Sequence, residues 1–262
     1  MSASLVAVEY PQPEIAVVHM RREEKMNALN DELIQGLTDV GEQLMDDATV
    51  KAVILTGGKR VFSAGADVST FDGIDQETNV NRVRRMTQKG VRMADLWQNL
   101  PAVTIAAVEG GAVGGGLGMA LSCDWRVFSR DAWGYVPEVR LGLNYGWGTL
   151  AKLSALAGPA RAKWISILCR RHPAAELFDW GVVEHVSEPG KALDEALVLA
   201  REVAGLPALA PQMIKRSVNA YAFALAKSST YADMDDMLVC MTDEEGRRAR
   251  EQTTREVGKR AK

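Results

Sequence analysis

Residues 104–121, TIAAVEGGAVGGGLGMAL, contain the pattern that decides the fold. TIAAV is a short apolar run typical of a buried strand, and LGMAL starts a helix-like run. Between them lie Gly110, Gly111 and the consecutive Gly114, Gly115 and Gly116. Glycines at a strand-to-helix turn let the backbone approach a ligand with no Cβ in the way. Because a helix start adds free N–H groups and the positive end of its dipole, this turn favours an anion or a developing oxyanion.

Strand-like and helix-like segments alternate around this turn. Apolar runs predict strands at 15–20, 51–56 and 125–128, and the glycine- and alanine-rich segment 61–68 is typical of a strand plus a turn. Helical spacing predicts helices after Asn30 and at 79–100. The alternation indicates an α/β fold with a mainly parallel sheet. From about Leu150 the spacing is helical throughout, with helices expected at 160–169, 174–180, 191–204, 211–226 and 230–256. We therefore expect a β/α part over 1–200 and an all-helical C-terminal part over 201–262.

Composition excludes several classes of function. The formal net charge of −3 gives no general attraction to nucleic acid. The three cysteines, Cys123, Cys169 and Cys240, lack the spacing of a metal site or a disulfide framework. The glycine turn matches neither GxGxxG nor GxxxxGK[ST], so no dinucleotide or nucleoside triphosphate site follows. We see no signal-peptide pattern and no apolar stretch of ~18 uncharged residues, so we expect a cytoplasmic protein with no membrane partner.

Two further segments have the composition of a site. VFSAGADVS at 61–69 has small residues that permit close backbone approach, followed at once by Asp67. In AWGYVPEVRLGLNYGWG at 132–148, Glu138 lies between the apolar Val136, Val139 and Leu141. A carboxylate among apolar groups has a raised pKa, which makes Glu138 a candidate acid or base. From local sequence alone, a turn at 61–69 and a surface glutamate at 138 remain the alternatives.

The spacing of the three segments resembles the enoyl-CoA hydratase/isomerase (crotonase) superfamily. The pair AGAD and GGG at this separation is highly specific, and the resemblance covers nearly the whole chain. It extends over REEKMNALN (22–30), AVILTG, FSAGADVS, AAVEGGAVGGGLGMALSCDWRVFS, YVPEVRLGL, GPARAKWISIL, AAELFDWGVVEHVSE and APQMIKRSV. The resemblance implies a spiral of ββα units with a helical C-terminal trimerisation region, and a homotrimer or a dimer of trimers.

The resemblance also implies a site for an acyl-CoA or enoyl-CoA thioester. By position, the backbone N–H groups of Ala66 and Gly115 form an oxyanion hole that stabilises a thioester enolate, and each such donor typically contributes ~3–4 kcal/mol to the transition state. Coenzyme A enters as part of the substrate, and no permanently bound cofactor or metal is expected. The residues that would line the adenine and pantetheine path are Lys25, Met26, Ala28, Ala64, Asp67 and Val68, with Lys25 a contact to a phosphate.

This chain departs from the family's hydratase pattern at one position. Hydratases of the family use two glutamates, of which the second matches Glu138 and the first aligns with Gly118. Addition of water normally uses one carboxylate to activate the water and the other to handle the α-proton. In isomerases of similar layout, a single base removes the α-proton and returns a proton at the γ-carbon.

Other branches of the family match less well. The helper tyrosine of the single-glutamate hydratase-lyases aligns with Phe71, and the dehalogenase aspartate aligns with Gly146. Tyr145 resembles in position a tyrosine of methylmalonyl-CoA decarboxylases and is a further candidate catalytic residue, although those enzymes lack the equivalent of Glu138. Trp147 is bulky where many relatives have a small residue, which predicts a reshaped or shorter acyl pocket.

These observations rank the candidate functions of the protein. The first is an isomerase-like enzyme that uses Glu138 as its only carboxylate acid/base. An enoyl-CoA hydratase is the second, followed by lyase or decarboxylase chemistry. A different class, a non-catalytic acyl-CoA binder, is motivated by Gly118.

Overall fold

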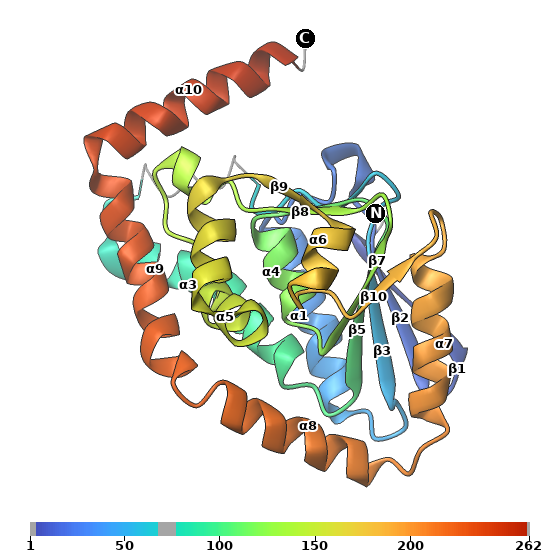
Figure 1. The fold of residues 1–262 in the computed structure, drawn as a ribbon. Coiled ribbons are helices and arrows are strands. Elements are labelled where there is room, and N and C mark those ends of the chain that lie inside the picture. Colours follow the sequence, from blue (N-terminus) through green and yellow to red (C-terminus); the bar gives the residue numbers. More distant parts are fainter. Residues whose placement is uncertain (1–3, 68–76, 261–262) are drawn as a thin grey trace.

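Ten described strands form two sheets in the computed structural model, which describes residues 4–67 and 77–260 (Figure 1). The larger sheet has the strand order β1-β2-β3-β5-β7-β10. Its strands are β1 (Val6–Gln12), β2 (Ile15–Met20), β3 (Ala52–Thr56), β5 (Val103–Val108), β7 (Trp125–Ser129) and β10 (His185–Ser187). In this larger sheet, β1 is the one described strand that pairs antiparallel, as a hairpin with β2. The prediction of a mainly parallel sheet is confirmed.

The smaller sheet has the order β4-β6-β8-β9 and supports the glycine turn. Its strands are β4 (Val61–Ser63), β6 (Gly111–Val113), β8 (Trp133–Tyr135) and β9 (Arg171–Pro173). β6 lies in the middle, parallel to β4 and to β8. The sheet therefore aligns the starts of three segments that continue into the AGAD loop, the GGG turn and the segment with Glu138.

Helices cover both faces of the larger sheet (Figure 1). One face packs on α7 (Ala192–Ala204), whose Ala192, Ala196 and Ala200 contact buried side chains of β2, β3, β5 and β7. The opposite face packs against α1 (Asp31–Asp46), α3 (Val80–Gln98) and α4 (Gly115–Leu121) in the main core. α1 begins at Asn30, whose side chain accepts a hydrogen bond from the N–H of Leu33, as its N-cap position predicts.

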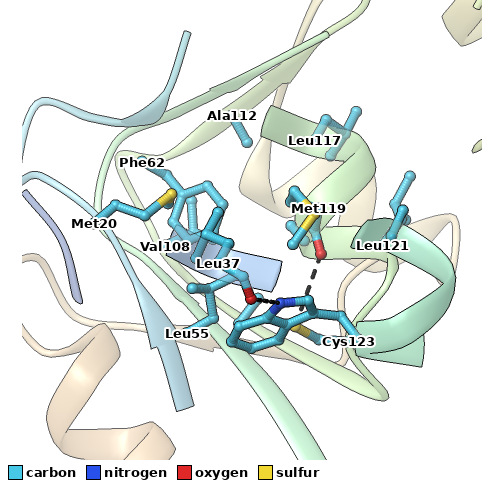
Figure 2. Close-up of a cluster of buried hydrophobic side chains, with 14 of the residues drawn as sticks. Met20, Leu37, Leu55, Phe62, Val108, Ala112, Leu117, Met119, Leu121 and Cys123 are labelled. Carbon is cyan, nitrogen blue, oxygen red and sulfur yellow. Dashed lines mark hydrogen bonds between the residues drawn. The ribbon is translucent and has the colours of Figure 1, made fainter. Parts of the chain in front are cut away.

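The main core extends directly beneath the glycine turn. Figure 2 shows Phe62, Ala112, Leu117 and Met119 gathered between the strands and α4. Trp97 of α3 is fully buried there and donates its indole N–H to the Leu37 carbonyl of α1 at 3.0 Å. The turn is thus seated on a rigid, close-packed interior, which fixes its backbone.

The C-terminal helices lie on the outside of the molecule: the first passes near β5, and the second lies beside α3 and α5 (Thr149–Leu168) (Figure 1). They are α8 (Leu209–Ala222), α9 (Ala226–Thr242) and α10 (Glu244–Arg260). The short helix α6 (Ala174–Asp179) lies earlier in the chain, in the core region. Met234 and Met237 of α9 pack on Leu143, whereas most of α10 extends away from the body of the molecule (Figure 1). The division of the chain at residue 200 into two regions stays a prediction.

Several expectations about the second half of the chain are wrong. Residues after Leu150 are not helical throughout, because β9 and β10 add short strands to the edges of the two sheets. These strands have three residues each, too few for an alternating pattern to be visible in the sequence. The single helix expected at 230–256 is divided into α9 and α10 at Asp243, whose backbone is extended.

Within the described part of the chain, no single helix has both the length and the apolar composition to cross a membrane, and only the sharply bent pair α7–α8 meets those criteria jointly.

Candidate active site

The AGAD loop lies against the segment 26–29. The N–H of Ala64 donates to the Met26 carbonyl at 2.9 Å, and the N–H of Leu29 donates to the Gly65 carbonyl at 2.8 Å. The N–H of Asp67 in turn donates to the Leu29 carbonyl at 3.2 Å. For the N–H of Ala66, no partner is found among residues 4–67 and 77–260, as expected for a donor that faces a ligand.

Polar side chains also connect the AGAD loop to the segment 26–29. Arg22 donates to the Ala28 carbonyl at 2.8 Å and pairs with the Asp67 carboxylate at 2.6 Å, both side chains being mostly buried. The buried Asn27 accepts from the N–H of Arg22 at 2.7 Å and donates to the Phe62 carbonyl at 3.2 Å. Met26 and Asn27 have positive φ angles of 53° and 49°, so the loop depends on these bonds to keep an unfavourable backbone. Arg22 and Asn27 are supporting residues that the sequence analysis did not single out.

The predicted coenzyme A residues fall into one neighbourhood where they are described. Met26 and Ala28 lie beside Ala64 and Asp67 through the bonds above. Lys25 ends the short helix η1 (Glu23–Lys25) and is exposed. Val68 lies outside the described residues, as does Phe71.

The AGAD loop and the GGG turn meet at Gly65. A Cβ on Gly65 would lie 2.6 Å from the Val113 carbonyl oxygen and 3.0 Å from the nitrogen of Gly115. Gly65 also has φ +84°, so only glycine suits both its conformation and its space. The close approach brings the two predicted donors, Ala66 and Gly115, to neighbouring backbone positions. The N–H of Gly115 belongs to the first turn of α4, where helical N–H groups have no carbonyl of their own helix to bond.

The Glu138 carboxyl lies directly over the same turn. A Cβ on Gly114 would overlap Glu138 Oε1 and lie 3.4 Å from its Cδ. Gly114 has φ 49° and ψ −122°, a conformation suited to glycine, so the turn offers space for this contact. Glu138 itself begins the short helix η2 (Glu138–Leu141), and its carbonyl accepts from the N–H of Leu143 at 2.9 Å.

Burial raises the pKa of the Glu138 carboxyl to about 8. Its Oε2 is buried and has no hydrogen-bond partner among the described residues. The direction of the pKa shift agrees with the expectation from sequence, but Val139, one of the side chains expected to shield the carboxyl, is exposed. The glycine turn and the core supply the shielding instead. A carboxyl that titrates near neutral pH and has one oxygen without a partner in the described part of the chain is suited to proton transfer.

Tyr145 contacts the turn from the other side. Its hydroxyl donates to the Gly114 carbonyl at 2.9 Å, and the side chain is buried. Burial and the nearby Glu138 charge raise the pKa of Tyr145 well above its ordinary value, so it remains a phenol. The Gly114 carbonyl and the Gly115 N–H belong to one peptide group, which the tyrosine therefore holds in position.

The space beside Gly118 is occupied. A Cβ at Gly118 would lie 3.0 Å from Thr149 Oγ1 and 3.9 Å from the Trp147 ring. Thr149 is fully buried, and its hydroxyl donates to the Gly146 carbonyl at 2.6 Å. Its role in filling the site was missed from sequence, because nothing local relates position 149 to position 118.

No group of three or more metal-ligating side chains is found in residues 4–67 and 77–260. At the glycine turn the structure brings together the two segments with the predicted backbone donors, the Glu138 carboxyl and Tyr145.

The family model described as enoyl-CoA hydratase/isomerase matches residues 11–259. The chain belongs to this family. Among its relatives, the short-chain-enoyl-CoA hydratase of Clostridium acetobutylicum is 34% identical over 207 residues, which cover 79% of this chain and 78% of that protein. The crotonyl-CoA hydratase of Syntrophomonas wolfei is 32% identical over 209 residues, with 79% of each chain covered.

The fold agrees with this membership. The crystal structure of an enoyl-CoA hydratase from Mycobacterium avium subsp. paratuberculosis K-10 is similar, with a TM-score of 0.85 and 25% identity over 97% of each chain. The protein is thus an enzyme of the enoyl-CoA hydratase/isomerase family with the crotonase fold, and the family acts on coenzyme A thioesters.

Proposed function

We propose that this enzyme isomerises an enoyl-CoA thioester through an enolate, with Glu138 as the only carboxylate acid/base. The observation that carries the proposal is the Glu138 carboxyl over Gly114, beside a position 118 that has no carboxylate and whose space Thr149 fills. In the reaction, the ionised Glu138 takes the α-proton, and the electron pair moves onto the thioester oxygen. As the enolate returns its electrons, the double bond moves, and the protonated Glu138 delivers the proton at the γ-carbon.

The backbone supplies the charge stabilisation in this proposal. The N–H groups of Ala66 and Gly115 donate to the thioester oxygen, and Tyr145 keeps the Gly114–Gly115 peptide in its orientation. Fixed donors aimed at a developing oxyanion contribute ~3–4 kcal/mol each, because they need no reorganisation during the reaction. The pKa of about 8 makes Glu138 a stronger base than an ordinary carboxylate once it is ionised.

For the coenzyme A moiety, we propose the path lined by Met26, Ala28, Ala64 and Asp67, with the exposed Lys25 at a phosphate. The backbone of these segments is the contact surface, because the Asp67 carboxylate pairs with Arg22. A trimeric or hexameric assembly and a cytoplasmic location stay predictions.

Hydration is the second candidate, and the relatives' names favour it. The two bacterial relatives above are named as hydratases, and both are more than 30% identical to this chain. Hydration by this enzyme would need Glu138 to serve both the water and the α-proton. Lyase or decarboxylase chemistry and non-catalytic acyl-CoA binding are lesser alternatives.

Product mass, together with chromatographic separation of double-bond isomers, separates these candidates after incubation with a panel of enoyl-CoA thioesters. We expect products of unchanged mass from 3-enoyl thioesters, and a Glu138→Gln variant with a kcat about 100-fold or more below the wild type. A gain of one water would favour the hydratase, and loss of carbon dioxide or an aldehyde would favour the other lyases. Binding of thioesters with no change in any substrate would mean that the protein is a binder.

A further inference from the structure

The indole of Trp147 packs between α3 and α4, against a glycine of each helix. A Cβ on Gly115 of α4 would lie 2.8 Å from Cζ3 and 2.9 Å from Cη2 of the indole, and a Cβ on Gly90 of α3 would overlap the ring. The indole thus occupies the space that any side chain at either position would need. It lies against the residue whose N–H is proposed to hold the thioester oxygen.

The backbone of Trp147 is unfavourable for a bulky residue. Its φ is 62°, in the left-handed region, and Gly148 follows with φ 67°. A large side chain is kept in this region only where its surroundings determine its position, and such residues cluster at functional sites. The position of the indole is therefore a specific feature of this loop, held by its neighbours on α3, α4 and α9.

A cavity of about 470 Å³ lies beyond the indole. α3, the start of α5 and the region of α8 and α9 surround it, and Trp147 is part of its wall. Val91, Ala220, Phe223 and Ala224 supply apolar lining, and the buried Lys152 is tied to Ser122 Oγ at 2.7 Å. Because Trp147 lies against Gly115 and also forms part of the wall of this cavity, its indole stands between the glycine turn and the cavity.

We propose that Trp147 sets the acyl-chain length that this enzyme accepts, limiting it to short acyl groups. A chain that continues past the enolate meets the indole instead of entering the cavity. Removal of the indole joins the cavity to the site and admits longer chains. This inference rests on the proposed role of Gly115 at the thioester and names the substrate class of that site.

Binding of two saturated thioesters tests the inference without requiring turnover. Calorimetry with butyryl-CoA and octanoyl-CoA compares ligands that differ only in chain length. We expect the wild type to bind butyryl-CoA about 10-fold or more tightly than octanoyl-CoA, since a closed pocket excludes added methylenes. Trp147→Gly removes the indole and places a glycine at a positive φ angle that suits it. In this variant, octanoyl-CoA should bind about 10-fold more tightly than it does to the wild type. Trp164→Ala, which removes an exposed tryptophan of α5, is the matched control and should leave both affinities unchanged.

Equal affinity of the wild type for the two thioesters would overturn the inference, and this result needs no variant to fold. A Trp147→Gly protein with native far-ultraviolet circular dichroism, cooperative thermal unfolding and no gain for octanoyl-CoA would also overturn it. Length-dependent binding with no turnover of any enoyl-CoA would support the inference while refuting the proposed catalysis. Turnover of short and long 3-enoyl thioesters at equal kcat/KM would support the proposed catalysis and overturn the inference about chain length.

Discussion

At the scale of single residues, Glu138 is kept in a state that opposes stability at neutral pH. The carboxyl is buried, its Oε2 has no partner within residues 4–67 and 77–260, and its pKa rises from 4.5 to about 8. In the unfolded chain the group ionises above about pH 4.5, whereas the folded protein keeps it protonated up to about pH 8. The folded state therefore loses stability relative to the unfolded state as pH rises through this window, and the loss is complete above pH 8.

Glu138→Gln should remove this loss, because the amide has nearly the shape of the neutral acid and does not titrate. We expect the variant to be more stable than the wild type by on the order of 2–3 kcal/mol at pH 8, with much of the difference gone at pH 5. Urea unfolding at the two pH values measures it. A difference that does not depend on pH would show that the carboxyl titrates normally in the folded protein.

Tyr145 allows a test of the peptide that holds the Gly115 donor. Tyr145→Phe removes the hydroxyl that bonds the Gly114 carbonyl, so this peptide loses a restraint while the ring still fills the core. We expect kcat to fall about 10-fold with little change in KM, since the lost stabilisation belongs to the transition state. Steady-state kinetics with the active thioester measures the effect, and Tyr221→Phe, at a highly exposed tyrosine, is the control. A lower melting temperature with unchanged kcat would mean that Tyr145 has only a structural role.

At the scale of elements, α4 and the start of α5 pack closely against each other at Gly118. The 3.0 Å approach of a Cβ to Thr149 Oγ1 is tighter than ordinary packing, so the glutamate expected at position 118 from the hydratase pattern would meet the Thr149 side chain. A glutamate placed at position 118 would have to displace the Thr149 side chain, so the substitution alone does not create a second carboxylate site.

Gly118→Glu should accordingly be destabilising by ~1–3 kcal/mol, because overpacking displaces Thr149, and it should not raise hydration of crotonyl-CoA. Thermal unfolding and a hydration assay test both parts. Gly205→Glu is the control, since a Cβ there would lie 3.4 Å from its nearest neighbour and the backbone φ is −70°. A stable Gly118→Glu protein with increased hydratase activity would contradict the interpretation of this helix contact.

At the scale of the whole molecule, the C-terminal helices support the catalytic segment from outside the β/α core. A Cβ on Gly142, which ends η2, would overlap Gly246 at the start of α10, so the two segments are in direct contact. Arg250 is buried nearby and donates to the Leu141 carbonyl at 3.2 Å and to the Met241 carbonyl at 2.8 Å. The contacts join α9, α10 and η2, the short helix that begins at Glu138.

Arg250→Ala should weaken this junction. We expect a loss of ~1–3 kcal/mol in the free energy of unfolding, because buried carbonyls lose their donor, together with a lower kcat as η2 becomes less fixed. Arg248→Ala removes an exposed arginine of the same helix, paired only with Glu244 in the described structure, and should leave both quantities unchanged. Equal effects of the two substitutions would rule out a special role for the junction.

The sequence by itself determined the elements whose patterns are local. The strand at 15–20 and the N-cap at Asn30 appear as predicted, because apolar periodicity and capping depend on adjacent residues. The glycine turn was visible for the same reason, since the close backbone approach that it permits requires glycine at particular positions. The short strands β6, β8, β9 and β10 were not predicted, because pairing with distant segments defines them.

Only the tertiary structure decided how the site is closed. It brings Gly65 against Gly115, Tyr145 onto the Gly114 carbonyl, Thr149 beside Gly118 and Trp147 between Gly90 and Gly115. Each contact joins segments about 30 to 60 residues apart, and no local pattern specifies a distance between such segments. The predicted donors, Ala66 and Gly115, were named from the resemblance of the AGAD and GGG segments to the family, whereas the shape and the proton affinity of the pocket depend on packing around them.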